Sequence, residues 1–212
     1  MAKVPGAAPV KSRLHAALTE PRATELYRCF LLDRLDALAA VPGISPVVAF
    51  TPPEAAARMR ALAPPGFRMI AQDGVDLTER LIRLFDRLLE THPAALAMDS
   101  DSPTLPMAYV AEAAALAAAE ADVVVGPSDD GGYYLIGLCA PQPALFRDVS
   151  WSRADVLAVT LARARELGLR VRLLPAWFDV DTEADLRRLR AELATAGPGP
   201  ARTTAFVREL AR

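Results

Sequence analysis

Short apolar segments alternate with longer segments of helical periodicity along most of this chain, and that alternation restricts the fold more than any other feature. The predicted strands are 46–50, 67–71, 94–98, 122–125, 133–138 and 170–174. The predicted helices are 19–38, 53–62, 76–90, 106–120, 153–167 and 182–193, followed by a short terminal helix. Strands that alternate with helices form mostly parallel sheets. The sequence therefore predicts a three-layer α/β fold with a mostly parallel central sheet and helices on both faces.

The composition fits one folded domain over residues 1–212. The chain has 212 residues, of which 52% are hydrophobic, and this is enough to form a full core. The tail 194–212, with its Gly-Pro-Gly-Pro run, is expected to be loosely attached. The net charge of -2 gives no reason to expect nucleic acid or an anionic membrane surface as a partner. With no signal-peptide core, and with Cys29 and Cys139 interpreted as reduced thiols, a cytoplasmic location is expected.

The predicted strand 94–98 stops at two acids, Asp99 and Asp101. Ligands of open α/β sheets bind outside the carboxyl ends of the strands, and carboxylates there suit a hard divalent cation such as Mg²⁺ or Mn²⁺. No lysine or arginine occurs from residue 88 to residue 146, so no cation within that segment neutralises its acids. We predict that Asp99 and Asp101 are metal ligands; the alternative is a helix cap ahead of Pro106.

A second Asp-x-Asp pair ends the apolar stretch before the predicted helix 182–193. We expect either Asp179 or Asp181 to complete the metal shell from a distant part of the chain. The alternative is that Asp181, with Thr182, caps the helix. The metal hypothesis requires Asp101 and the 179–181 pair to meet in the fold.

The first loop, residues 1–14, is basic. It holds Lys3 and Lys11, the only lysines among 24 cationic residues, together with Ser12 and Arg13. Lysine ammonium and arginine guanidinium groups both bind phosphate, so these residues are predicted to contact a nucleotide's phosphates. The loop is not a Walker A motif, and the alternative is a solvated basic loop. No strand is predicted ahead of it, although a nucleotide-binding sheet normally has one there.

Two further segments follow predicted strands. In the first, 72–80, Asp76 either caps the next helix or, with Arg80, faces nucleotide phosphate.

In the second, 126–138, Asp130 precedes Gly131 and Gly132, which permit close approach of a ligand to the backbone. Tyr133 can stack on a ring or hydrogen-bond to a hydroxyl. The alternative for this second segment is a tight hairpin with core tyrosines.

These segments, in this order, resemble a bacterial family of nucleotide-diphospho-sugar-transferase-like proteins, the DUF2064 group. The matching residues are Lys3 and 11–14 in the basic loop, 101–106 in the acidic motif, 126–127 and 130–138 in the long Gly-Gly-Tyr motif, Trp151 with Ser152, and 179–182. The group is often labelled a glycosyltransferase and is associated with radical-SAM arsenosugar or selenium gene clusters. The resemblance implies a GT-A-type, Rossmann-like fold, a divalent metal and a nucleotide-activated donor. It also implies substrate contacts for Gly131, Gly132, Tyr133, Trp151 and Ser152.

The expected function is therefore a metal-dependent transferase, most plainly a glycosyltransferase that uses a nucleoside-diphosphate sugar and a small acceptor. Asp101 and Asp130 are the expected catalytic residues. The alternatives are a nucleotidyltransferase that joins an NTP to a phosphorylated small molecule, releasing pyrophosphate, and a non-catalytic nucleotide-binding protein. An Asp101→Ala variant is expected to lose nucleotide binding at little cost in stability, because an exposed strand-end acid supports little packing.

Overall fold

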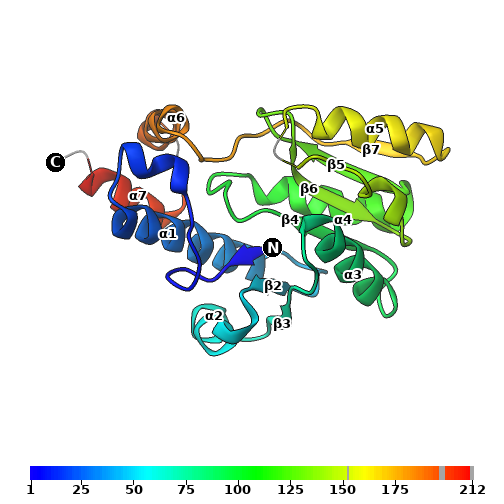
Figure 1. The fold of residues 1–212 in the computed structure, drawn as a ribbon, viewed down its shortest axis with the longest axis horizontal. Coiled ribbons are helices and arrows are strands. Elements are labelled where there is room, and N and C mark those ends of the chain that lie inside the picture. Colours follow the sequence, from blue (N-terminus) through cyan, green and yellow to red (C-terminus); the bar gives the residue numbers. More distant parts are fainter. Residues whose placement is uncertain (152, 196–198, 211–212) are drawn as a thin grey trace. The chain divides into compact units, whose positions relative to one another are not determined.

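The computed structural model describes residues 1–151, 153–195 and 199–210, and this part of the chain divides into two compact units (Figure 1). Unit 1 comprises Met1–Ala71, Ser100–Leu105 and Asp179–Arg212. Unit 2 comprises Gln72–Asp99 and Pro106–Phe178. The single domain predicted for residues 1–212 stays a prediction.

In unit 1, strands β1 (Ala2–Lys3), β2 (Val47–Thr51) and β3 (Arg68–Ala71) form a parallel sheet in the order β1-β2-β3. The expectation that no strand precedes the basic loop was wrong. Ala2 pairs with Phe50 and Lys3 with Thr51, and the Val4 N–H donates to the Thr51 carbonyl at 2.8 Å. The sequence did not predict this strand because two residues are too few to show the alternation of side chains that is typical of strands. Residues 2–3 of the predicted basic loop are therefore a strand, and the rest of the loop follows it.

Unit 1 also contains six helices among its described residues. They are η1 (Ser12–Ala16), α1 (Glu20–Ala39), η2 (Pro53–Ala55), α2 (Ala56–Leu62), α6 (Glu183–Thr195) and α7 (Ala201–Glu209). Leu31 and Leu35 of α1 share a buried cluster with Val48 and Phe50 of β2 and with Met59 of α2. This cluster fixes the end of β2 beside which the first loop begins.

The C-terminal helix α7 is docked against α1, so the prediction of a loosely attached tail was wrong (Figure 1). Phe206 and Val207 are buried, and the guanidinium of Arg22 lies 4.5 Å from the Phe206 ring centre. Asp33 of α1, whose side chain is 5% exposed, accepts hydrogen bonds from the Arg202 and Thr203 N–H groups at 3.2 and 2.8 Å. Since the N-cap residue of α7 is a proline, Asp33 caps this helix from a different helix.

We expect Asp33→Ala to lower the free energy of unfolding by about 2–4 kcal/mol, because it leaves two helix N–H groups, one of them buried, without their acceptor and removes one of the two acids that pair with Arg202. Asp36 provides a matched control, since its carboxylate also contacts Arg202, at 2.6 Å, but is 52% exposed. Asp36→Ala should cost less than about 1 kcal/mol. Urea unfolding measures both variants, and equal losses would contradict the capping role.

In unit 2 the strand order is β4 (Ala95–Met98), β6 (Tyr133–Leu138), β5 (Val123–Pro127) and β7 (Val171–Leu173). Strand β6 runs antiparallel to β4 and to β5, whereas β5 and β7 are parallel. The helices of this unit are α3 (Leu77–Leu89), α4 (Met107–Ala119), η3 (Pro143–Leu145) and α5 (Val156–Glu166). The valines of β5 are fully buried, as their continuous apolar run predicts.

The predicted α/β class is confirmed: parallel strand pairs β1–β2, β2–β3 and β5–β7 are flanked by helices. Each predicted helix and strand is found, with ends that shift by a few residues. Among the described residues, no helix has both the length and the apolar character that crossing a membrane requires.

Candidate functional site: a buried lysine between two carboxylates

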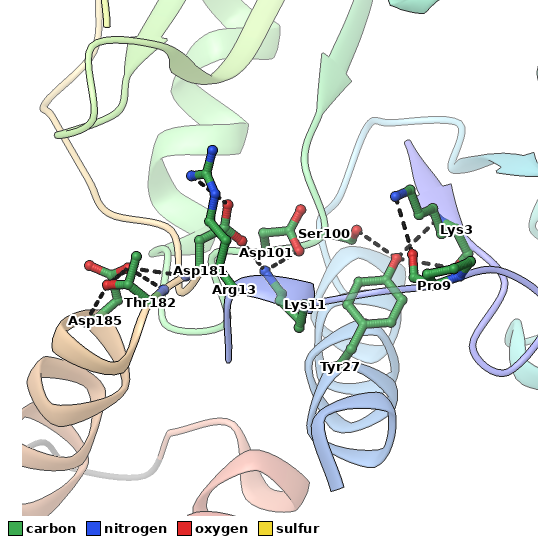
Figure 2. A network of polar contacts seen from close by, with 10 residues as sticks. All are labelled: Lys3, Pro9, Lys11, Arg13, Tyr27, Ser100, Asp101, Asp181, Thr182 and Asp185. Atoms are coloured by element: carbon green, nitrogen blue, oxygen red, sulfur yellow. Dashed lines mark hydrogen bonds and ion pairs between the residues drawn. The ribbon is translucent and has the colours of Figure 1, made fainter. Parts of the chain in front are cut away.

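Lys11 is the centre of the candidate site, which lies wholly within unit 1 (Figure 2). Its backbone is in the left-handed region, with φ 50° and ψ 37°, directly before η1. Its side chain is 2% exposed, and its ammonium forms ion pairs with Asp101 and, at 2.8 Å, with Asp181. Three segments far apart in the sequence therefore meet at one nitrogen atom. The predicted meeting of Asp101 with the 179–181 pair is observed, through Asp181.

The Lys11 ammonium stays charged at this buried position. Burial by itself would lower the pKa of Lys11, but the charges and hydrogen bonds of Asp101 and Asp181 outweigh it and raise the pKa above the ordinary lysine value. The ammonium also lies 5.8 Å from the centre of the Phe30 ring. Arg13, whose side chain is 65% exposed, adds a second cation 3.9 Å from Asp181. The two acids thus share one buried cation, and Asp181 also lies near an exposed one.

The local structure of the 179–185 segment orients Asp181. Asp185 accepts hydrogen bonds from the N–H groups of Asp181 and Thr182 at 3.1 and 2.7 Å, and Thr182 Oγ1 accepts from the Asp185 N–H at 3.3 Å. This reciprocal arrangement is a capping box at the start of α6, so Thr182 caps as predicted. Since Asp185 caps this end of the helix, the Asp181 carboxylate can face Lys11.

The Asp101 segment is anchored by a buried hydroxyl network. The Tyr27 hydroxyl of α1 accepts from the Lys3 N–H at 3.0 Å, donates to the Lys3 carbonyl at 3.1 Å and lies 2.9 Å from Ser100 Oγ. The backbone is tied as well, because the Val180 N–H donates to the Asp101 carbonyl at 3.0 Å. Tyr27 therefore joins the end of β1 to the residue before Asp101.

We expect Tyr27→Phe to lower the free energy of unfolding by about 1–3 kcal/mol, because it removes one buried hydroxyl that serves three polar groups. Ser100→Ala, which leaves the two hydrogen bonds between Tyr27 and Lys3 in place, should cost less. Urea unfolding of both variants measures this difference. A Tyr27→Phe protein as stable as the native chain would show that the network contributes nothing to stability.

The donor set at Lys11 suits a divalent ion. Asp101 and Asp181 supply carboxylate oxygens, their side chains are 35% and 39% exposed, and Mg²⁺ is usually held by one or two carboxylates plus substrate phosphates. Within residues 1–151, 153–195 and 199–210, no group of three or more His, Cys, Asp or Glu side chains could hold a metal ion.

The other two predicted metal ligands are Asp179 and Asp99. Asp179 belongs to unit 1. Asp99 belongs to unit 2, where its N–H extends the β4–β6 pairing by donating to the Tyr134 carbonyl. Their ligand roles stay predictions.

Other predicted phosphate ligands have structural tasks. Asp76 caps α3, with its Oδ1 accepting from the Glu79 N–H at 2.9 Å. Arg80 Nε donates to the Gly74 carbonyl at 3.0 Å and so closes the loop between β3 and α3. Lys3 Nζ donates to the Pro9 carbonyl at 3.2 Å, and Ser12 is the first residue of η1. Asp76 and Arg80 belong to unit 2, whereas Lys11 belongs to unit 1.

The Asp130 turn joins β5 to β6 in unit 2. Asp130 Oδ1 accepts from the Gly132 N–H at 2.9 Å. Gly131 has φ +89°, and a Cβ built there would lie 2.0 Å from the Ala154 carbonyl oxygen. Gly131 is thus required for backbone packing.

Tyr133 and Trp151 pack against each other edge to face, with ring centres 6.2 Å apart. Trp151 also stacks on Phe146, and its Nε1 donates to Thr78 Oγ1 at 2.9 Å. Thr78 in turn donates to the Phe146 carbonyl at 3.2 Å, so these aromatics fasten α3 to the 146–151 segment. The predicted substrate residue Ser152 lies outside the described residues.

Sequence reasoning did not single out Tyr27, Ser100 or Asp185. Ser100 stands between Asp99 and Asp101, and Asp185 has capping-box spacing from Thr182, so local signals existed for both. Tyr27 gave no local signal, because its partners Lys3 and Ser100 are 24 and 73 residues away along the chain.

The fold and site define an α/β protein in which a basic loop after the first strand meets two acidic segments. The chain belongs to the family described as "Uncharacterized protein conserved in bacteria (DUF2064)", whose model matches residues 34–153. The resemblance found in the sequence is thereby confirmed.

A structure from Desulfovibrio desulfuricans G20, described provisionally as a nucleotide-diphospho-sugar transferase, is 31% identical to this chain. The match covers 98% of this chain and 91% of that one, with a TM-score of 0.91. CMP:2-keto-3-deoxy-manno-octonic acid synthetase complexed with CTP matches at 16% identity over 78% of this chain and 87% of its own, with a TM-score of 0.48. That similarity is too low to support any statement about this chain. No curated protein gives a significant match.

Proposed function

We propose that this protein is a metal-dependent transferase that takes a nucleotide-activated donor, and that it transfers a glycosyl group from a nucleoside-diphosphate sugar to a small acceptor. The observation that carries the proposal is the convergence of Lys11, Asp101 and Asp181 beside the loop that follows β1. The 31% identity to the Desulfovibrio protein supports the choice of donor.

Each residue of this cluster has a task in that reaction. Asp101 and Asp181 would hold Mg²⁺ or Mn²⁺, which, when bound, supplies positive charge to the diphosphate that leaves with the nucleotide. Lys11 fixes the two carboxylates side by side. Arg13 is exposed and carries a permanent charge, so it can bind the donor's phosphates. The catalytic role of Asp130 and the substrate roles of Gly131, Gly132, Tyr133, Trp151 and Ser152 stay predictions.

Nucleotidyl transfer from an NTP to a phosphorylated small molecule is the second candidate. The observation that favours it is a further cation in the first loop, Lys3. Its exposed Nζ contacts a carbonyl rather than a carboxylate, so its charge is not neutralised by that partner. A triphosphate needs more positive charge than a diphosphate. A sheet without its first strand would favour a third candidate, a non-catalytic nucleotide-binding protein. Strand β1 is present and pairs with β2, so the sheet gives that candidate no support.

The released product distinguishes these candidates. The protein would be incubated with Mn²⁺ and a panel of UDP-, GDP- and TDP-sugars with mixed small acceptors, and separately with each NTP and phosphorylated small acids. Release of nucleotide from a sugar donor supports glycosyl transfer. Release of pyrophosphate from an NTP rejects that reaction in favour of nucleotidyl transfer. Nucleotide binding by calorimetry with neither product, over long incubation, supports the non-catalytic protein.

A further inference from the structure

Lys11 differs from an ordinary phosphate-binding lysine in its surroundings. Such a lysine needs an ammonium that a ligand can reach, whereas the Lys11 side chain is 2% exposed. Asp101 and Asp181 are much more exposed, at 35% and 39%. The ammonium therefore lies on the buried side of the two carboxylates, and a ligand that approaches from solvent meets the carboxylates first.

This placement changes the charge that an incoming ion meets. Two carboxylates alone present a charge of about −2 to a divalent ion, and the adjacent ammonium reduces this to about −1. Arg13, at 3.9 Å from Asp181, reduces it further. Sites that bind divalent ions tightly without substrate are rich in uncompensated carboxylates, and the described residues hold no group of three such ligands. The two carboxylates thus meet at one ammonium, with their charge largely cancelled.

We propose that Lys11 is a built-in counter-cation that keeps the Asp101–Asp181 pair from holding a divalent ion by itself, so that the ion binds together with the phosphates of the nucleotide. This inference rests on the proposed function, because it assigns the ion and the nucleotide to one site. Phosphate oxygens supply the negative charge and the ligands that the protein lacks. Binding of ion and nucleotide is then coupled, and each must raise the affinity for the other by the same factor.

The test compares Mn²⁺ binding to the native chain and to Lys11→Met, followed by the electron paramagnetic resonance signal of free Mn²⁺. Without nucleotide, Lys11→Met should bind Mn²⁺ at least about tenfold more tightly, because a cation adjacent to both carboxylates is gone. Arg28→Met is the matched control: it also removes one positive charge from unit 1, but from an exposed pair with Glu25 at 3.0 Å. Its Mn²⁺ affinity should equal that of the native chain. Unchanged or weaker Mn²⁺ binding by a folded Lys11→Met protein would overturn the proposal.

A second measurement does not depend on whether Lys11→Met folds. UDP, GDP, TDP and CDP are titrated into the native chain by calorimetry with and without Mn²⁺. The proposal requires at least about tenfold tighter nucleotide binding with Mn²⁺ than without it. If a nucleotide binds with equal affinity in the presence and absence of Mn²⁺, the proposal is overturned. If no nucleotide binds under any condition, the proposed function fails, while the Mn²⁺ comparison of Lys11→Met with Arg28→Met still decides the role of Lys11.

Discussion

Under the proposed function, Asp101→Asn is expected to reduce turnover by at least about 100-fold, because it converts one of the two carboxylates assigned to the ion into a neutral amide. The substitution also deprives the buried Lys11 ammonium of one of its two acids. We therefore expect a loss of about 1–3 kcal/mol in the free energy of unfolding. The sequence alone predicted little cost in stability, since it showed an acid at a strand end but not the buried cation beside it.

The effects on chemistry and on stability can be separated by comparing variants. Asp36→Asn, at an exposed acid of the same unit, should leave turnover unchanged. Asp181→Asn should resemble Asp101→Asn in both measurements, because the two carboxylates share Lys11. Product release is followed with saturating Mn²⁺, at a temperature where all variants are folded by circular dichroism. Native turnover in folded Asp101→Asn would remove this residue from the mechanism.

Gly131→Ala is expected to cost at least about 3 kcal/mol or to prevent folding. The residue has φ +89°, which is unfavourable for alanine, and the added methyl would lie 2.0 Å from the Ala154 oxygen and 2.6 Å from its carbonyl carbon. Both contacts are with backbone, so no side-chain rotation relieves them. The Gly131 carbonyl also accepts from the Leu157 N–H at 2.9 Å, which resists a shift of the turn.

The neighbouring Gly132→Ala is the matched control. Its nearest contact is Asp130 Oδ1 at 3.2 Å, the end of a side chain that can rotate away. A cost of less than about 1.5 kcal/mol is expected. Urea unfolding decides, and two variants of similar stability would show that Ala154 does not constrain the turn.

Local patterns were sufficient for most of the fold. Helix α3 has a regular apolar face and a capping aspartate, and strand β5 is a continuous apolar run, so both were predictable from their own residues. The two exceptions depend on distant partners. Strand β1 exists because β2 offers it hydrogen-bonding groups, and α7 is held by Asp33, which lies about 170 residues earlier in the chain.

The candidate site, like the fold, could be predicted only in part from local sequence. Asp101, Asp181 and Lys11 could be selected from the sequence, because each stands next to a turn or strand end and has the chemistry that a phosphate or metal site needs. Their mutual arrangement could not be predicted, since nothing local shows that Lys11 is buried or that its nitrogen lies between two acids. Tyr27 is the extreme case, as it looks like any helix tyrosine until its three partners are known.

Unit 1 is assembled from Met1–Ala71, Ser100–Leu105 and Asp179–Arg212, which has a consequence for biosynthesis. On the ribosome, the β1–β2–β3 sheet can emerge early, yet Lys11 must wait for Asp181, and α1 for its partner α7. Until Asp181 and α7 have been synthesised, the Lys11 ammonium lacks at least one of its two acids, and the apolar surface of α1 that α7 covers is exposed. Stalled or prematurely terminated translation products should therefore be prone to aggregation and degradation.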